Sequence, residues 1–179
     1  MVNLTLYTVK AVVMLDSEGG RVLAKYFGAD YASAKDQKAF EKGLYDKTKR
    51  APHGEILLFD NQVVLYRFHE DVFFYIVGMP EENEAMLLII LNAFSDAVSM
   101  LLRYGHQISK RVILENLDLV VLALDETIDE GIVLETDPSA IVARVSKPRE
   151  NLSDVPLSEQ TLIQAYQTAK EKFGTALLK

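Results

Sequence analysis

The sequence predicts an α+β fold in which helices flank a five-stranded, mainly antiparallel sheet. Two observations carry this prediction. Five short segments rich in β-branched and aromatic residues are separated by brief turns, which is typical of antiparallel strands. Three longer segments repeat apolar residues every three or four positions, which is the period of a helix. A sheet with one helix on one face and two on the other would bury the apolar side of each element.

The first elements are a hairpin and a helix. Leu6–Leu15 and Arg21–Phe27 are predicted strands, and the segment between them, DSEGG, ends in two glycines that can take the positive φ of a tight turn. Ser33–Lys49 is a predicted helix with basic residues in its last turn, where positive charge suits the helix dipole. Pro52 and Gly54 then end the helical pattern.

The remaining elements of the predicted fold follow in one run. Three strands are expected at Glu55–Phe59, Gln62–Phe68 and Val72–Val77, joined by short polar turns. Two helical stretches come after them, Asn83–Tyr104 and about Ser109–Glu130, with Gly105 between them.

The helix predicted over Asn83–Tyr104 is apolar around most of its circumference. Its polar residues form a narrow stripe: Asn92, Ser95, Asp96, Ser99 and Arg103. Such a helix must be covered on more than one side. We expect its own sheet and the later helices to cover most of it, and another subunit to cover the remainder.

The pattern weakens after Gly131. Residues 1–146 are expected to form one domain, residues 147–157 (KPRENLSDVPL) a linker, and residues 158–179 a C-terminal amphipathic helix. The apolar face of that helix consists of Leu162, Tyr166, Ala169, Phe173 and Leu177.

Composition excludes several classes of function. The net charge of −7 argues against nucleic acid as a partner, because binding phosphates requires clustered Lys and Arg. Without cysteine there is no disulfide or thiolate metal site, and a reducing cytosol is expected. The amino terminus carries no signal peptide pattern. The longest apolar run in the long helix, Ala85–Leu91, is too short for a bilayer, so membrane association is expected only through partners.

Residues able to carry out chemistry are few and scattered. His53, His69 and His106 fall in separate predicted loops, no nucleophile elbow or phosphate-binding glycine pattern is present, and we expect no enzyme activity, no metal and no cofactor. An acidic cluster comprises Asp125, Glu126, Asp129, Glu130, Glu135 and Asp137. A solvated helix end explains this cluster best, although a cation or a basic partner could bind it. The basic run Lys47–Arg50 could touch anionic lipid but is better explained as the charged end of its helix.

Several segments resemble a known family in the same order. They are YTVKA at 7–11, RVLAKY at 21–26, QKAFEK at 37–42, FYIVG at 74–78, ENEAML at 82–87, LALDE at 122–126, GIVLE at 131–135 and VPLSEQT at 155–161. On these segments the chain is similar to the zeta-subunit family of coatomer, the COPI vesicle coat, within the adaptor small-chain or longin-type family. The resemblance spans nearly the whole chain.

The resemblance implies a longin-type fold and a non-enzymatic role in a cytosolic hetero-oligomeric coat. It implies direct pairing with the coatomer gamma subunit, and indirect contact with an Arf-family GTPase and the membrane through the other coatomer subunits. It also implies a place on the cytosolic face of Golgi membranes and COPI-coated vesicles, in Golgi-to-ER retrograde and intra-Golgi transport.

Candidate partner-facing residues follow from the same comparison. Sigma chains of clathrin adaptors, which this chain also resembles, hold acidic-dileucine signals near the end of the long helix. The corresponding apolar residues here are Val98, Leu101, Leu102 and Ile108. On the C-terminal helix the candidates are Leu162, Tyr166 and Phe173.

Three other readings stay open. A sigma-type clathrin adaptor chain is the first alternative, although sigma chains usually end sooner after Glu135. A longin-bearing membrane fusion protein would need a heptad coiled coil and a membrane anchor, and Ser158–Leu178 is too short and too polar for both. A small cytosolic enzyme would need a site assembled from residues far apart in the sequence.

Overall fold

The computed structural model describes residues 8–28, 30–51, 56–102 and 108–146. These residues all belong to one compact unit, Met1–Ser146. Its centre is a five-stranded sheet in the order β2-β1-β5-β4-β3, in which every neighbouring pair is antiparallel. The strands are β1 (Val9–Asp16), β2 (Arg21–Tyr26), β3 (Ile56–Phe59), β4 (Gln62–His69) and β5 (Val72–Gly78). The predicted α+β class and five-stranded sheet are confirmed.

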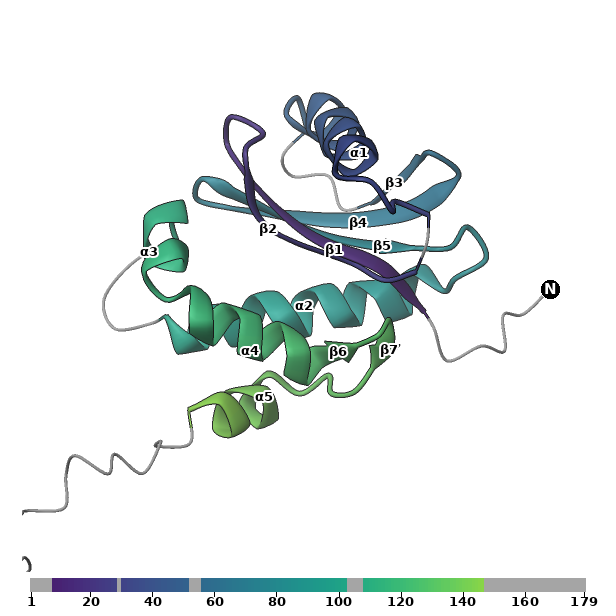
Figure 1. Ribbon diagram of the computed structural model, residues 1–179. Helices are drawn as coiled ribbons and strands as arrows, with labels where there is room; N and C mark the ends of the chain where they lie inside the picture. The colour runs from purple at the N-terminus through teal and green to yellow at the C-terminus, as the bar shows by residue number, and fades with distance from the viewer. Residues whose placement is uncertain (1–7, 29, 52–55, 103–107, 147–179) are drawn as a thin grey trace, which may run out of the picture. The chain divides into compact units, whose positions relative to one another are not determined.

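Helices cover both faces of this sheet (Figure 1). The helices are α1 (Ala34–Thr48), α2 (Glu84–Leu101), α3 (Lys110–Glu115), α4 (Leu117–Thr127) and α5 (Pro138–Val145). Helix α1 lies alone on one face, and α2, α4 and α5 lie on the other. Because side chains alternate along a strand, each face has its own apolar core.

The central strand β5 is buried along its whole length, since it lies between β1 and β4 and has helices on both faces. Phe73, Tyr75 and Val77 pack towards α1, and Phe74 and Ile76 pack towards α2. On the α1 side the Tyr75 hydroxyl lies 2.7 Å from the Thr48 hydroxyl, so both buried polar atoms are satisfied. The continuous apolar run seen in the sequence therefore reflects a strand covered on two sides.

Two sharp turns depend on residues with positive φ. Asp60 (φ 52°) and Asn61 (φ 56°) join β3 to β4, as a type I′ hairpin turn requires. Glu130 (φ 48°) and Gly131 (φ 84°) play the same part between β6 (Ile128–Asp129) and β7 (Ile132–Val133). The Gly131 carbonyl oxygen accepts hydrogen bonds from the Thr8 and Val9 amides, both at 3.1 Å. This small hairpin is thereby fixed to the start of β1.

Two predicted elements differ from the structure. The single helix expected over Ser109–Glu130 is broken at Asn116, whose backbone leaves the helical region (φ −127°, ψ 34°) and whose side-chain amide donates to the Val112 carbonyl at 2.9 Å. Such a side-chain bond to the backbone competes with helix continuation. The same stretch ends at Thr127, because Ile128 is extended and enters β6. After Gly131, where the sequence pattern weakens, the structure has a further helix, α5, which is capped by the Asp137 side chain.

Helix α2 begins where the sequence indicated, with the Asn83 side chain accepting from the Ala85 amide at 2.9 Å. It packs on the sheet and against α4 and α5, which explains its broad apolar surface. Within the described residues, α2 is the one helix that is long and apolar enough to cross a membrane. Half of its 18 residues are buried in the domain. Ser95, assigned above to the polar stripe, is fully buried and donates to the Asn92 carbonyl.

Candidate functional site

The residues proposed for an apolar groove near the end of α2 lie in the domain's own core. Val98 is 0% exposed, Leu101 8% and Leu102 5%. Ile108 is half-buried and packs against the same cluster. As the structure has them, these side chains contact the domain itself and do not line an open groove. The other three candidates, Leu162, Tyr166 and Phe173, lie outside the described residues, as do the linker and the C-terminal helix.

Exposed apolar side chains gather elsewhere, and all of them lie on the α2 side of the sheet. Among the described residues, the large apolar side chains that are exposed are Ile56, Leu58, Met86, Ile89, Met100, Leu114, Leu122 and Leu134. The two on edge strand β3 belong to this side because Ile56 pairs with Leu65 and Leu58 with Val63, and both partners point into the α2-side core. The α1 side of the described structure exposes no large apolar side chain.

Part of this apolar surface is concave. Met86 and Ile89 of α2, together with Ile132–Thr136 of β7 and the loop after it, line a groove of about 500 Å³ that we call the α2–β7 groove. Met86 is 44% exposed, Ile89 49% and Leu134 54%. Because the Gly131 turn fixes β7 to β1, the wall formed by Leu134 is held in place by the sheet. An apolar, preformed groove of this kind suits an apolar side chain from another protein.

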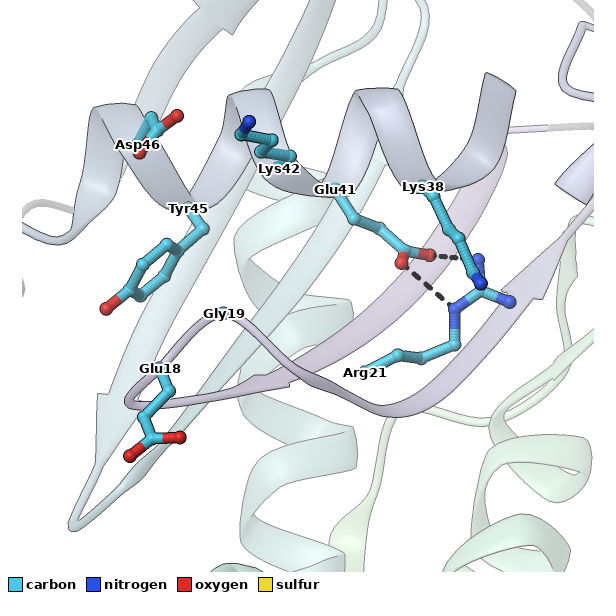
Figure 2. Close-up of a pocket in the computed structure, with 8 residues that line it drawn as sticks. All are labelled: Glu18, Gly19, Arg21, Lys38, Glu41, Lys42, Tyr45 and Asp46. Carbon is cyan, nitrogen blue, oxygen red and sulfur yellow. Dashed lines mark hydrogen bonds and ion pairs between the residues drawn. The ribbon is translucent and has the colours of Figure 1, made fainter. Parts of the chain in front are cut away.

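A second hollow, of about 560 Å³, lies between the β1–β2 hairpin and α1, and Figure 2 shows the residues that line it. Here Arg21 makes a two-pronged contact with Glu41: Nε donates to Oε2 at 3.0 Å, and Nη2 lies 2.6 Å from Oε1. The Tyr26 hydroxyl also donates to Glu41, at 2.9 Å. The carboxylate is 5% exposed, and three charge-assisted contacts satisfy it. Burial, and then the hydrogen bond to Glu41, raise the pKa of the Tyr26 hydroxyl well above its usual range.

This hollow does not have the composition of a catalytic site. It contains neither a histidine nor a serine or cysteine nucleophile, and its buried carboxylate is fully engaged by Arg21 and Tyr26. Tyr45, which points towards the hairpin in Figure 2, donates its hydroxyl to the Ser17 carbonyl. The Arg21–Glu41–Tyr26 contact therefore joins α1 to the hairpin and has a structural role.

The scattered candidate residues do not assemble into a metal site in the described part of the chain, where no group of three His, Asp or Glu side chains is placed to hold an ion. His53 and His106 lie outside the described residues. His69, predicted in a loop, is the last residue of β4, half-buried and edge-on to Phe74 at 5.5 Å. Burial, and then the nearby Arg67 charge, lower the pKa of His69, and its buried Nε2 has no hydrogen-bond partner.

The acidic cluster is dispersed over three elements. Asp125 pairs with Lys25 at 2.7 Å, and Arg144 contacts both Glu126 (3.4 Å) and Glu135 (3.0 Å). Asp129 lies outside α4, because it belongs to β6. These carboxylates hold α4, α5 and β2 together, which favours the interpretation that they are structural surface groups.

One polar contact was not indicated by any sequence signal. Lys110, at the start of α3, places its Nζ 2.6 Å from Asp16, while its amide donates to Asp71 at 2.8 Å. Burial alone would raise the pKa of Asp16, but the hydrogen bonds from Lys110 and from the Gly20 and Glu18 amides outweigh it and lower the pKa. Three segments far apart in the chain meet here, so α3 is fixed to two hairpin turns.

Comparisons with known proteins agree with this architecture. Residues 8–151 match the family model of the clathrin adaptor complex small chain. The chain is 45% identical to coatomer subunit zeta-1 of Homo sapiens over 175 residues, which cover 98% of this chain and 96% of the relative. It is 44% identical to coatomer subunit zeta-1 of Oryza sativa over 174 residues, covering 96% and 97%.

A structural comparison shows the same fold. A chain in a homology model of the full-length AP-3 complex, in a stretched open conformation, matches with a TM-score of 0.60 and 15% identity, covering 92% of this chain and 98% of that one. The identity to zeta chains, rather than this fold similarity, decides the family. The chain belongs to the coatomer zeta-subunit family, within the small chains of adaptor complexes.

Proposed function

We propose that this chain is a non-enzymatic structural subunit of the COPI vesicle coat that pairs with the coatomer gamma subunit. In this role it acts in Golgi-to-ER retrograde and intra-Golgi transport, in the cytoplasm and on the cytosolic face of Golgi membranes and COPI vesicles. The observation that carries the proposal is the 45% identity to coatomer zeta-1 over nearly the full length of both chains. Contact with an Arf-family GTPase belongs, in this proposal, to the other subunits of the coat.

The distribution of apolar surface supports a hetero-oligomeric role. A monomeric soluble protein seldom exposes large contiguous apolar patches, and such patches mark interaction sites. Here the exposed large apolar residues lie on the α2 side, and Met86, Ile89 and Leu134 converge on the α2–β7 groove. We assign this groove to the gamma subunit, with apolar side chains of that subunit filling it.

A sigma-type small chain of a clathrin adaptor complex is the second candidate function. The match of residues 8–151 to the clathrin adaptor small-chain model favours it as a class. Both candidates predict a large complex, and only the identity of the associated chains separates them.

The test is native gel filtration of the tagged full-length chain from cell lysate, with mass spectrometry of the co-eluting chains. Elution with the gamma and other coatomer subunits supports the proposal, whereas elution with clathrin adaptor subunits supports the second candidate. Elution near the chain's own mass of 20.1 kDa, without a stable partner, would refute both.

Two variants locate the partner surface. Met86→Asp with Leu134→Asp places charges in the α2–β7 groove, and should release the chain from the complex while circular dichroism and thermal unfolding stay unchanged. Ile56→Asp with Leu58→Asp is the matched control, because it alters apolar residues away from the groove that are somewhat more exposed than Met86 and Leu134. Loss of the complex in the β3 variant alone would move the interface to the sheet edge.

A further inference from the structure

The outer face of α1 carries a row of lysines that form no ion pair with the described residues. Between Ala34 and Arg50 there are six basic and three acidic residues, a net charge of +3, in a chain whose total is −7. Lys35, Lys38 and Lys42 follow one another at spacings of three and four residues, so they lie along one side of the helix. All three are exposed. We call them the α1 stripe.

The acidic residues of α1 are engaged by other groups. Glu41 is buried against Arg21 and Tyr26, Asp46 pairs with Lys49, and Asp36 accepts from the Ser33 hydroxyl at the start of the helix. Figure 2 shows Lys42 pointing away from the hairpin and Lys38 reaching down beside Arg21. Arg21, and not a lysine of the stripe, forms the ion pair with Glu41, so among the described residues Lys38 and Lys42 keep their charges unpaired beside the hollow.

The basic residues on the opposite side of the sheet are paired, in contrast. Lys25, Arg111 and Arg144 each contact a carboxylate of the helical layer within 3.4 Å. None of the lysines in the α1 stripe has an ion-pair partner among the described residues. Among the described residues, lysines without an ion pair are therefore concentrated on the face that exposes no large apolar side chain.

From this asymmetry we propose that the α1 stripe binds an anionic phospholipid surface. Protein interfaces are enriched in aromatic residues, methionine and arginine and depleted in lysine, and their centres are apolar. The described part of the α1 face has lysines and no large exposed apolar side chain, which does not suit a protein partner. An anionic membrane needs only accessible positive charge near its surface, without shape complementarity. The apolar α2 side is left free for a protein partner on the far side of the sheet.

The strength of this contact follows from the number of lysines. A basic residue near an anionic leaflet contributes about 1 kcal/mol, which corresponds to about a fivefold change in affinity per lysine. The three lysines of the α1 stripe then contribute roughly 100-fold together. At this strength a single chain binds the membrane weakly. Several linked copies bind it much more tightly, because once one copy is bound the others are held close to the same surface.

The experiment uses the biotinylated full-length chain loaded on streptavidin tetramers. Its sedimentation is measured with phosphatidylcholine vesicles that contain or lack phosphatidylserine. We expect binding that requires phosphatidylserine and falls at an ionic strength of about 0.15 M, because exposed charges are screened there. Replacing the stripe with Lys35→Gln, Lys38→Gln and Lys42→Gln should weaken binding by about 100-fold or more.

The matched control is Lys25→Gln, Arg111→Gln and Arg144→Gln, which makes the same change in net charge on the opposite side of the sheet. This variant should bind the vesicles as the unaltered chain does. Equal losses in both variants, or no dependence on phosphatidylserine at low salt, would overturn the proposal. If the stripe variant still bound vesicles but no longer bound a polyglutamate peptide, the ligand of the α1 stripe would be an acidic protein segment and not a lipid. Neither result depends on whether the chain co-elutes with coatomer.

Discussion

Replacement of Gly131 by alanine should destabilise the domain more than any other glycine substitution of the same conformational type. Gly131 has φ 84°, and a Cβ atom there would lie 2.6 Å from the Val9 carbonyl oxygen, which is backbone and cannot rotate away. The left-handed conformation costs alanine about 1–2 kcal/mol, and the stiffer unfolded chain returns about 0.4–1 kcal/mol. Relief of the clash moves the hairpin away from β1 and weakens two hydrogen bonds worth about 1 kcal/mol each. The expected total loss is about 3 kcal/mol.

Gly28 provides a control for the conformational part of this loss. Its φ is 94°, but an added Cβ would have no atom within 4 Å, so Gly28→Ala should cost only about 1 kcal/mol. The assay is urea unfolding of the full chain followed by circular dichroism, with the slope of the transition checked for each variant. The clash accounts for the difference of about 2 kcal/mol. Equal losses for the two variants would show that β1 and the β6–β7 hairpin are not held together as the structure shows.

Three further predictions concern buried polar groups. Arg21→Met should lower the free energy of unfolding by about 2–3 kcal/mol, because Glu41 stays buried with one fewer partner. Arg111→Met removes only an exposed ion pair and should change the free energy of unfolding far less; similar costs of the two variants in urea unfolding would contradict this. The lowered pKa of Asp16 stabilises the fold above the ordinary value of 3.8, and this contribution is lost as the pH falls further. The stability difference between the unaltered chain and Asp16→Asn, measured by thermal unfolding, should therefore shrink in acid; a constant difference would count against it. The pKa of His69 is lowered in the folded state, so the unfolded state binds more protons and the fold should lose stability below pH 6.5. His69→Phe should remove this loss of stability. If the variant kept the same pH profile of stability, His69 would not be the cause of the loss.

Much of the local structure follows from the sequence because its signals are short-range. The segment between Asp16 and Gly20 predicts its hairpin, Ser33 and Asn83 predict the starts of α1 and α2, and alternation together with apolar runs predicts the five strands. These features depend on φ preferences, caps and side-chain periodicity within a few residues. The sequence did not predict the break at Asn116, because an asparagine can occupy either a continuous helix or a helix break. Contacts with other elements determine which of the two conformations forms.

The candidate site was less predictable because exposure is a property of the whole fold. The periodicity of α2 indicated that its apolar surface is wider than one face. The resemblance to sigma chains suggested Val98, Leu101 and Leu102 for a groove, but they lie in the core. Met86, Ile89 and Leu134 are apolar residues like many others in the sequence, and only the position of β7 beside α2 leaves them exposed. The Lys110 contact with Asp16 likewise joins residues that no local pattern connects.

The sequence by itself indicated the family and the α+β class, and it contains no recognisable catalytic motif. Motif order and short-range periodicity can be identified without the tertiary structure. The tertiary structure alone decided which apolar residues remain uncovered and which charges remain unpaired. On the α2 side every lysine and arginine named above finds a carboxylate, whereas Lys35, Lys38 and Lys42 find none among the described residues. Pairing and burial depend on distances between segments far apart in the sequence, and folding alone sets those distances.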